Sequence, residues 1–174
     1  MNEMRNDIEK MVRIALIKLY ENDKYLITNT HVSSPGKDGH VSERGIVVRF
    51  AIYLQELMYN SAIKDYNLDV EYNRNMGYLK CLPNTDWEKY GAFPDLIIHK
   101  RGNNDSNLLV IEFKTHWNKN KTDVKLDIDK LKAFIKEPYA YKKSLFVMLN
   151  ENEPKLFWIY ENTTIDEIML SIKR

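Results

Sequence analysis

The stretch FPDLIIHKRGNNDSNLLVIEFK, Phe93–Lys114, contains two short runs rich in leucine, isoleucine and valine. The runs are Phe93–Lys100 and Leu108–Lys114, and the residues between them are polar and include Gly102. Two strand-like runs joined by a short polar loop are typical of an antiparallel hairpin. The stretch therefore predicts two paired β-strands.

The expected register of this hairpin brings three charged residues together. If the chain turns near Asn103 and Asn104, paired residues have numbers that sum to about 207, which sets Asp95 opposite Glu112. Directly opposed residues point to the same face of a sheet, as do residues two apart on one strand. Asp95, Glu112 and Lys114 are therefore predicted to share a face, although a slip of one residue would separate them.

Two carboxylates and an ammonium group among apolar strand residues predict a particular chemistry. Partly buried charges are costly unless they are paired or bound to metal, and oxygen ligands suit Mg²⁺ or Mn²⁺. Such an ion polarises a phosphoryl oxygen and lowers the pKa of a bound water, while a lysine can orient that water or offset negative charge. The trio predicts phosphodiester hydrolysis. The alternative for Glu112 and Lys114 is a structural salt bridge, which leaves Asp95 without an explanation.

The rest of the chain alternates between helical and strand-like patterns. Apolar residues at helical spacing predict helices at Asn6–Tyr20, Ser42–Asn60, Val124–Lys136 and Ile165–Ile172. Strands are predicted at Lys24–Thr28, Leu68–Arg74, Ser144–Leu149 and Lys155–Tyr160. His31–His40 is expected to be a loop and Asn75–Ala92 a long connection. This order predicts a single mixed α/β domain over residues 1–174.

Glu43 is a further candidate, in the first turn of the helix predicted from Ser42. One reading is an acid that favours the positive end of the helix dipole, worth about 0.3–1 kcal/mol. However, Glu43 precedes Val47 by four residues and Phe50 by seven, which places it on the core-facing stripe. A carboxylate there needs a partner, and we expect a metal ion or its water to provide one.

Pro94-Asp95, followed after sixteen residues by Glu112-Phe113-Lys114, resembles the core motif of the PD-(D/E)xK nuclease superfamily, the restriction endonuclease-like proteins. The segments Ser42–Leu54, Asp69–Arg74 and Asp127–Leu131 also resemble a small uncharacterised bacterial group of that superfamily. The resemblance covers Ser42–Leu149 and leaves the N-terminal helix and loop, residues 1–40, outside. It implies a restriction endonuclease-like core with a central mixed sheet flanked by helices. It also implies that Asp95, Glu112, Glu43 and the Phe113 carbonyl hold the metal.

For five other polar residues, a role in the site is either left open or is less expected than a structural role. Asp69 and Glu71 alternate on the predicted strand, which leaves open whether Glu71 borders the site or lies on a solvated face. His99 shares a face with Asp95, and a hydrogen-bonded structural histidine is the expected reading. Asp127 and Lys130 have helical spacing and are expected to form an ordinary surface ion pair.

Composition limits the class of protein. The chain has 174 residues, 44% of them hydrophobic and 29% charged, which is typical of a globular domain. No apolar run approaches the roughly 18 residues needed to cross a bilayer, and residues 1–10 are too polar for a signal peptide. The one cysteine, Cys81, cannot form an internal disulfide. We therefore expect a cytoplasmic protein without membrane partners.

Together these patterns predict a Mg²⁺- or Mn²⁺-dependent nuclease with DNA as the expected substrate. Asp95, Glu112, Lys114 and Glu43 are the predicted catalytic residues, and Lys114 is expected to orient or activate water. The alternatives are a nucleic-acid-binding module without turnover and an interaction domain that assembles through its first helix. A homodimer is left open.

Overall fold

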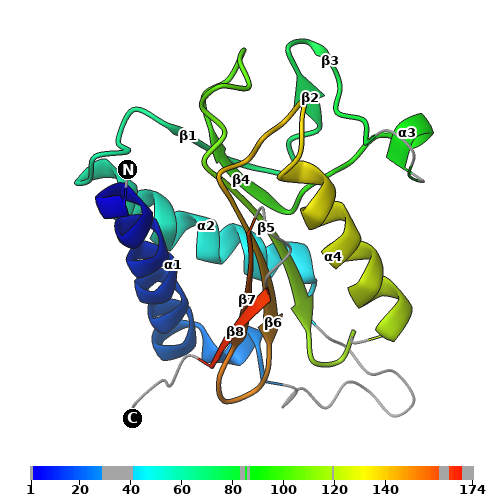
Figure 1. Cartoon of the computed structure of the whole chain (residues 1–174). Helices are drawn as coiled ribbons and strands as arrows, with labels where there is room; N and C mark the ends of the chain where they lie inside the picture. The colour runs from blue at the N-terminus through cyan, green and yellow to red at the C-terminus, as the bar shows by residue number, and fades with distance from the viewer. Residues whose placement is uncertain are drawn as a thin grey trace.

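The predicted hairpin lies inside a six-stranded mixed sheet in the computed structural model of the chain (Figure 1). The strand order is β1-β4-β5-β6-β7-β8, in which β5 and β6 are parallel and all other neighbours antiparallel. The strands are β1 (Asn67–Val70), β4 (Leu96–His99), β5 (Leu109–Thr115), β6 (Lys143–Leu149), β7 (Lys155–Ile159) and β8 (Ile165–Met169). The structure describes residues 2–28, 41–82, 85, 87–118, 120–160 and 165–169. The predicted mixed sheet flanked by helices is confirmed.

Helices cover both faces of the sheet. The helices α1 (Asn2–Asn22) and α2 (Glu43–Tyr59) lie on one side and α4 (Lys121–Phe134) on the other, as Figure 1 shows. Along β5, Ile111 and Phe113 join the core formed with α1 and α2, whereas Val110 joins the core formed with α4. Because side chains alternate along a strand, Glu112 and Lys114 face α4. In the described part of the chain, no helix is long and apolar enough to cross a membrane.

The helix α2 forms where the apolar spacing predicts it and directs its first turn toward the sheet. Its buried stripe includes Val47, Phe50 and Leu54, and the Phe50 ring packs edge-on against Phe113 with 5.1 Å between centroids. Ser42 is the residue before the helix, as predicted, but its side chain makes no capping hydrogen bond. The packing of α2 along β5 therefore carries Glu43 to the end of that strand.

Two predicted elements are wrong in type. Lys24–Thr28 is a 3₁₀ turn, η1 (Lys24–Leu26), because its amides bond locally, as from Ile27 N–H to Lys24 O at 2.9 Å, and it pairs with no described strand. Ile165–Ile172 was predicted as a helix, but Ile165–Met169 forms β8 and pairs antiparallel with β7. The apolar residues there also fit helical spacing, and the backbone partners that β7 offers decide the outcome. The predicted loop His31–His40 lies outside the described residues.

The predicted connection Asn75–Ala92 contains a small hairpin and a short helix. The strands β2 (Arg74–Asn75) and β3 (Tyr78–Leu79) pair around Met76 and Gly77, and α3 (Trp87–Tyr90) follows. Both turn residues have positive φ, 48° and 88°, as a two-residue hairpin turn of this hand requires. The usual sequence signal for such a turn is Asn-Gly. Because Met76 occupies the position of the asparagine, the sequence did not predict this hairpin.

A buried lysine links this insertion to the α4 side of the fold. Lys80 is 2% exposed, its Nζ lies 5.4–5.8 Å from the ring centroids of Tyr72, Phe134, Tyr139 and Tyr141, and it donates to the Tyr141 hydroxyl at 3.0 Å. Burial lowers the pKa of Lys80 to about 8, against a smaller opposing effect of a nearby carboxylate. The aromatic rings partly compensate for the lost hydration of the ammonium group.

We expect the stability of the protein relative to a Lys80→Met variant to rise with pH. The unfolded chain keeps the lysine proton up to a pKa of about 10.4, whereas the folded chain loses it near 8. Between these values the unfolded state binds more protons, so folding becomes more favourable as pH rises, by up to about 3 kcal/mol. Urea unfolding of both proteins between about pH 7 and pH 10 measures this, and a pH-independent difference would refute it.

Candidate active site

The hairpin register places Asp95 opposite Glu112, as predicted. The observed pairs are Leu96 with Ile111 and Ile97 with Val110, so Asp95 lies one residue before the start of β4 and faces the continuation of β5. There its Oδ2 atom accepts a hydrogen bond from the Phe113 N–H at 2.7 Å. This bond holds the Asp95 carboxylate at the point where the β4–β5 ladder ends.

Glu112 is the most deeply buried carboxylate of the site, at 1% exposure. Its Oε2 atom lies 2.8 Å from Lys130 Nζ, while its Oε1 atom is buried and has no hydrogen-bond partner among the described residues. Burial raises the pKa of Glu112 well above its usual value, and repulsion from Asp95 adds to this, with Lys130 opposing. Glu112 therefore offers a free oxygen at a place where negative charge is costly.

Asp95 shares this environment. Burial raises the pKa of Asp95 to about 6, against the opposing effects of the Phe113 N–H and Lys130. Repulsion from Glu43 and Asp127 adds to the rise. The acids of the site thus raise one another's pKa values, which a bound cation would relieve.

Lys114 lies between two carboxylates that come from opposite faces of the sheet. Its Nζ is 2.9 Å from Asp127 Oδ2 on α4 and 3.6 Å from Glu43 Oε1 on α2. Burial alone would lower the pKa of Lys114, but these carboxylates raise it above its ordinary value. Lys114 is therefore a fixed positive charge at neutral pH, which suits it to stabilising negative charge rather than to accepting a proton.

Glu43 reaches the site from the first turn of α2. Its Oε2 atom accepts the Thr115 backbone N–H at 2.9 Å and the Thr115 hydroxyl at 3.3 Å. These bonds join the start of α2 to the end of β5, and they leave Oε1 directed at Lys114. The structure thus brings together the four side chains predicted from the sequence, Asp95, Glu112, Lys114 and Glu43, while their roles remain predictions.

Two residues on α4 also belong to the site. Asp127 and Lys130 form the predicted ion pair, with 3.5 Å between Nζ and Oδ1, but the pair is buried and not on the surface. Asp127 and Lys130 are 8% and 7% exposed, and each contacts a residue of β5. Lys130 also donates to the carbonyl of Phe93 at 3.3 Å, two residues before Asp95. A signal in the sequence could have found them, because Lys130 precedes the buried Phe134 by four residues and so lies on the inward stripe of α4.

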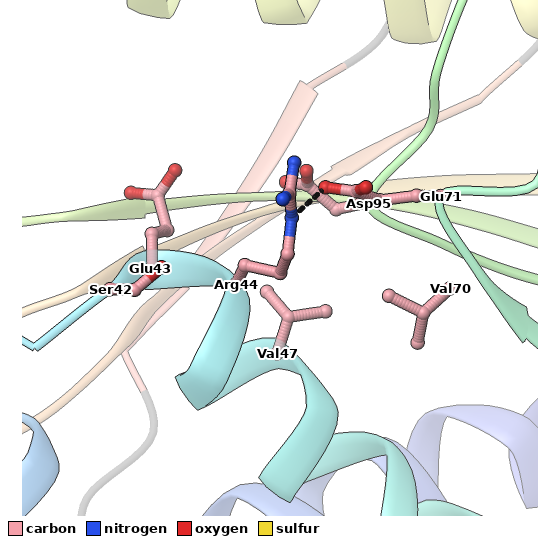
Figure 2. Close-up of a pocket in the computed structure, with 7 residues that line it drawn as sticks. All are labelled: Ser42, Glu43, Arg44, Val47, Val70, Glu71 and Asp95. Atoms are coloured by element: carbon pink, nitrogen blue, oxygen red, sulfur yellow. Dashed lines mark hydrogen bonds and ion pairs between the residues drawn. The ribbon is translucent and has the colours of Figure 1, made fainter.

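A hollow of about 360 Å³ opens beside the acids. Residues at the start of α2 line one side of it and residues near the ends of β1 and β4 line the other, as Figure 2 shows. The first group is Ser42, Glu43, Arg44 and Val47, and the second is Val70, Glu71 and Asp95. Glu71 thus lines the hollow, and its side chain is also 36% exposed, so both readings left open by its sequence hold in part. Asp95 lines this hollow, whereas Glu112 is 1% exposed and is not among the residues that line it.

His99 has the expected structural role. It is 4% exposed, and its Nε2 lies 2.8 Å from Asp69 Oδ2, which also accepts from Arg101 Nε at 2.9 Å. Burial works to raise the pKa of Asp69, but His99 and Arg101 together hold it well below its usual range. The three residues form a closed cluster around the β1–β4 pair, apart from the acids of the hollow.

The side chains of the site are of the kinds that bind a hard divalent cation, but they are not arranged as a complete metal site. Within the described ranges, no three acidic, histidine or cysteine side chains are arranged as a metal-binding group. The residues nevertheless supply oxygen ligands, a buried unpartnered Glu112 Oε1 and mutually repelling acids, which is the environment that Mg²⁺ or Mn²⁺ neutralises. Phe113 turns its ring to the opposite core, which leaves its backbone beside Asp95.

Comparisons with known proteins identify no relative whose function could be transferred to this chain. The chain has no significant match among protein-family models, curated proteins or solved structures.

Proposed function

We propose that this protein is a metal-dependent nuclease that hydrolyses phosphodiester bonds, with DNA as its expected substrate, on a restriction endonuclease-like core. The single observation that carries the proposal is the convergence of Asp95, Glu112 and Lys114 at the open end of the β4–β5 ladder, beside a hollow. A structural role explains an ion pair, but it does not explain a buried carboxylate oxygen without a partner next to a second acid.

In the proposed mechanism, Asp95 and Glu112 would hold the cation, with Glu43 and the Phe113 carbonyl as supporting groups. When bound, the ion would supply Lewis acidity toward a phosphoryl oxygen and would lower the pKa of a bound water. Lys114 keeps its charge and stabilises the negative charge that develops on the phosphate. Asp127 positions Lys114, since its Oδ2 lies 2.9 Å from Nζ.

The same geometry gives some support to a second candidate, a nucleic-acid-binding module without turnover. Lys130 already neutralises Glu112, and Lys114 is paired with Asp127 and Glu43. Such internal pairing would compensate for the charges of Glu112, Asp127 and Glu43 without a bound metal ion. Calorimetric titration with Mn²⁺ separates the candidates, because only the nuclease requires a metal site that depends on Asp95 and Glu112.

We expect cleavage to require Mg²⁺ or Mn²⁺ and to stop in chelator. Single-stranded, duplex and branched DNA and RNA are each incubated with the protein and either ion, and products are resolved by electrophoresis. Ca²⁺ is expected to support binding with little turnover, because its looser coordination positions water poorly. An Asp95→Asn protein purified in parallel controls for contaminating nucleases, and full activity in chelator would refute the metal mechanism.

A further inference from the structure

Among the described residues that line the hollow beside Asp95, Arg44 is the one that is cationic. It lies in the first turn of α2, directly after Glu43, and its side chain is 70% exposed. Its Nε lies 2.5 Å from Glu71 Oε1. Figure 2 shows the Arg44 side chain rising from the helix toward Glu71 and Asp95, with the dashed line marking the ion pair. A positive charge therefore lies at a hollow whose other charged residues, among those described, are the acids Glu43, Glu71 and Asp95.

The backbone of Glu71 is hydrogen-bonded to that of Asp95 at the place from which Glu71 contacts Arg44. It follows the last residue of β1 and has a φ of 51°, a conformation that side-chain-bearing residues adopt at a cost in free energy. Its N–H donates to the Asp95 carbonyl at 3.2 Å, which ties it to the start of β4. The Arg44–Glu71 pair is thus anchored to the backbone of a proposed metal ligand, although the pair itself is exposed to solvent.

We propose that Arg44 binds a backbone phosphate of the nucleic-acid substrate at the mouth of the hollow, and that Glu71 holds its guanidinium there until the phosphate takes the place of the carboxylate. The inference rests on the proposed function, because it assigns the hollow to the substrate. A polyanion entering between Glu43, Glu71 and Asp95 meets repulsion, and Arg44 offsets it. Exposed ion pairs contribute little, whereas a guanidinium can bind a phosphate through two hydrogen bonds, so the exchange favours the phosphate.

Arg49 provides a matched control on the same helix. Like Arg44 it is exposed, at 46%, and it is paired with a carboxylate, that of Asp23 at 3.0 Å. It does not line the hollow. Arg44→Gln and Arg49→Gln therefore remove the same charge from the same helix at two positions, of which only one borders the site.

The test measures fluorescence anisotropy of labelled single-stranded DNA, duplex DNA and single-stranded RNA with Ca²⁺ in place of a catalytic metal. Arg44→Gln is expected to weaken binding of the preferred probe about tenfold. It should also make the binding constant less dependent on salt concentration, by the amount that corresponds to about one phosphate contact. Arg49→Gln is expected to leave both unchanged. Glu71→Gln is expected to tighten binding several-fold, because it removes both a competitor for Arg44 and a negative charge. In a background of Arg44→Gln the same change should give a smaller gain, because only the relief of repulsion then remains.

The inference is overturned if Arg44→Gln binds every probe as the unmodified protein does, if Arg49→Gln weakens binding equally, or if the unmodified protein binds no probe. Cleavage is measured separately with Mn²⁺. An Arg44-dependent affinity without cleavage would refute the nuclease and retain the phosphate-binding role of Arg44. Cleavage with an unchanged affinity for Arg44→Gln would refute that role and retain the nuclease.

Discussion

Asp95→Asn and Glu112→Gln are each expected to lower the cleavage rate by about a thousandfold or more, because each removes one of the two carboxylates proposed to hold the cation. Both replacements are nearly isosteric. In Asp95→Asn the amide oxygen of the new side chain can still accept the hydrogen bond from Phe113 N–H, so the end of the β4–β5 ladder should survive. Single-turnover cleavage of the preferred DNA with Mn²⁺ measures the rate, and calorimetry measures the accompanying loss of Mn²⁺ affinity.

The melting temperature without metal distinguishes loss of chemistry from loss of fold. Asp95→Asn removes a partly buried carboxylate whose pKa is raised by repulsion from Glu43 and Asp127, so its melting temperature should stay level or rise. Asp129→Asn is the control, since Asp129 is exposed on α4 and does not line the hollow. If either site variant cleaved at a near-normal rate, the assignment of Asp95 and Glu112 as metal ligands would be withdrawn.

The part of the site that could be predicted from the sequence is the part that depends on local rules. A hairpin with a polar turn limits its own register, and alternation along the strands then determines which side chains share a face. For this reason Asp95, Glu112 and Lys114 could be grouped from the sequence alone. Glu43 could be added because the apolar stripe of α2 determines which side of that helix faces the sheet.

Other parts depend on contacts between distant segments and could not be predicted this way. The amides of Ile165–Met169 pair with β7, and only the position of β7 at that edge of the sheet makes a strand preferable to the helix that the apolar spacing suggested. The apolar stripe of α4 could have indicated that Asp127 and Lys130 face inward, but not what they contact. Their contacts with Lys114 and Glu112 follow from α4 packing over the face of β5 that carries both residues, which the sequence of α4 alone does not reveal.

Lys130→Met is expected to destabilise the protein strongly, and the loss should depend on Glu112. Lys130 is the nearest positive charge to a carboxylate that is 1% exposed, with 2.8 Å between Nζ and Oε2. Removing one partner of a buried ion pair leaves the other without compensation, which costs several kcal/mol, whereas removing both partners costs much less. Urea unfolding of Lys130→Met, Glu112→Gln and the double variant should therefore give a coupling free energy of about 1–3 kcal/mol.

The same variant tests how Lys130 acts on the proposed metal site. If the ammonium group only compensates for the charge of Glu112, its removal eliminates repulsion of the incoming cation, and Lys130→Met should bind Mn²⁺ more tightly and gain more stability from it than the unmodified protein does. Lys125→Met, on the exposed side of α4, removes an equal charge and should change stability by less than about 0.5 kcal/mol. A Lys130→Met protein that bound Mn²⁺ more weakly would mean that Lys130 holds Glu112 in its binding position. A coupling free energy near zero would show that the pair contributes nothing to the fold.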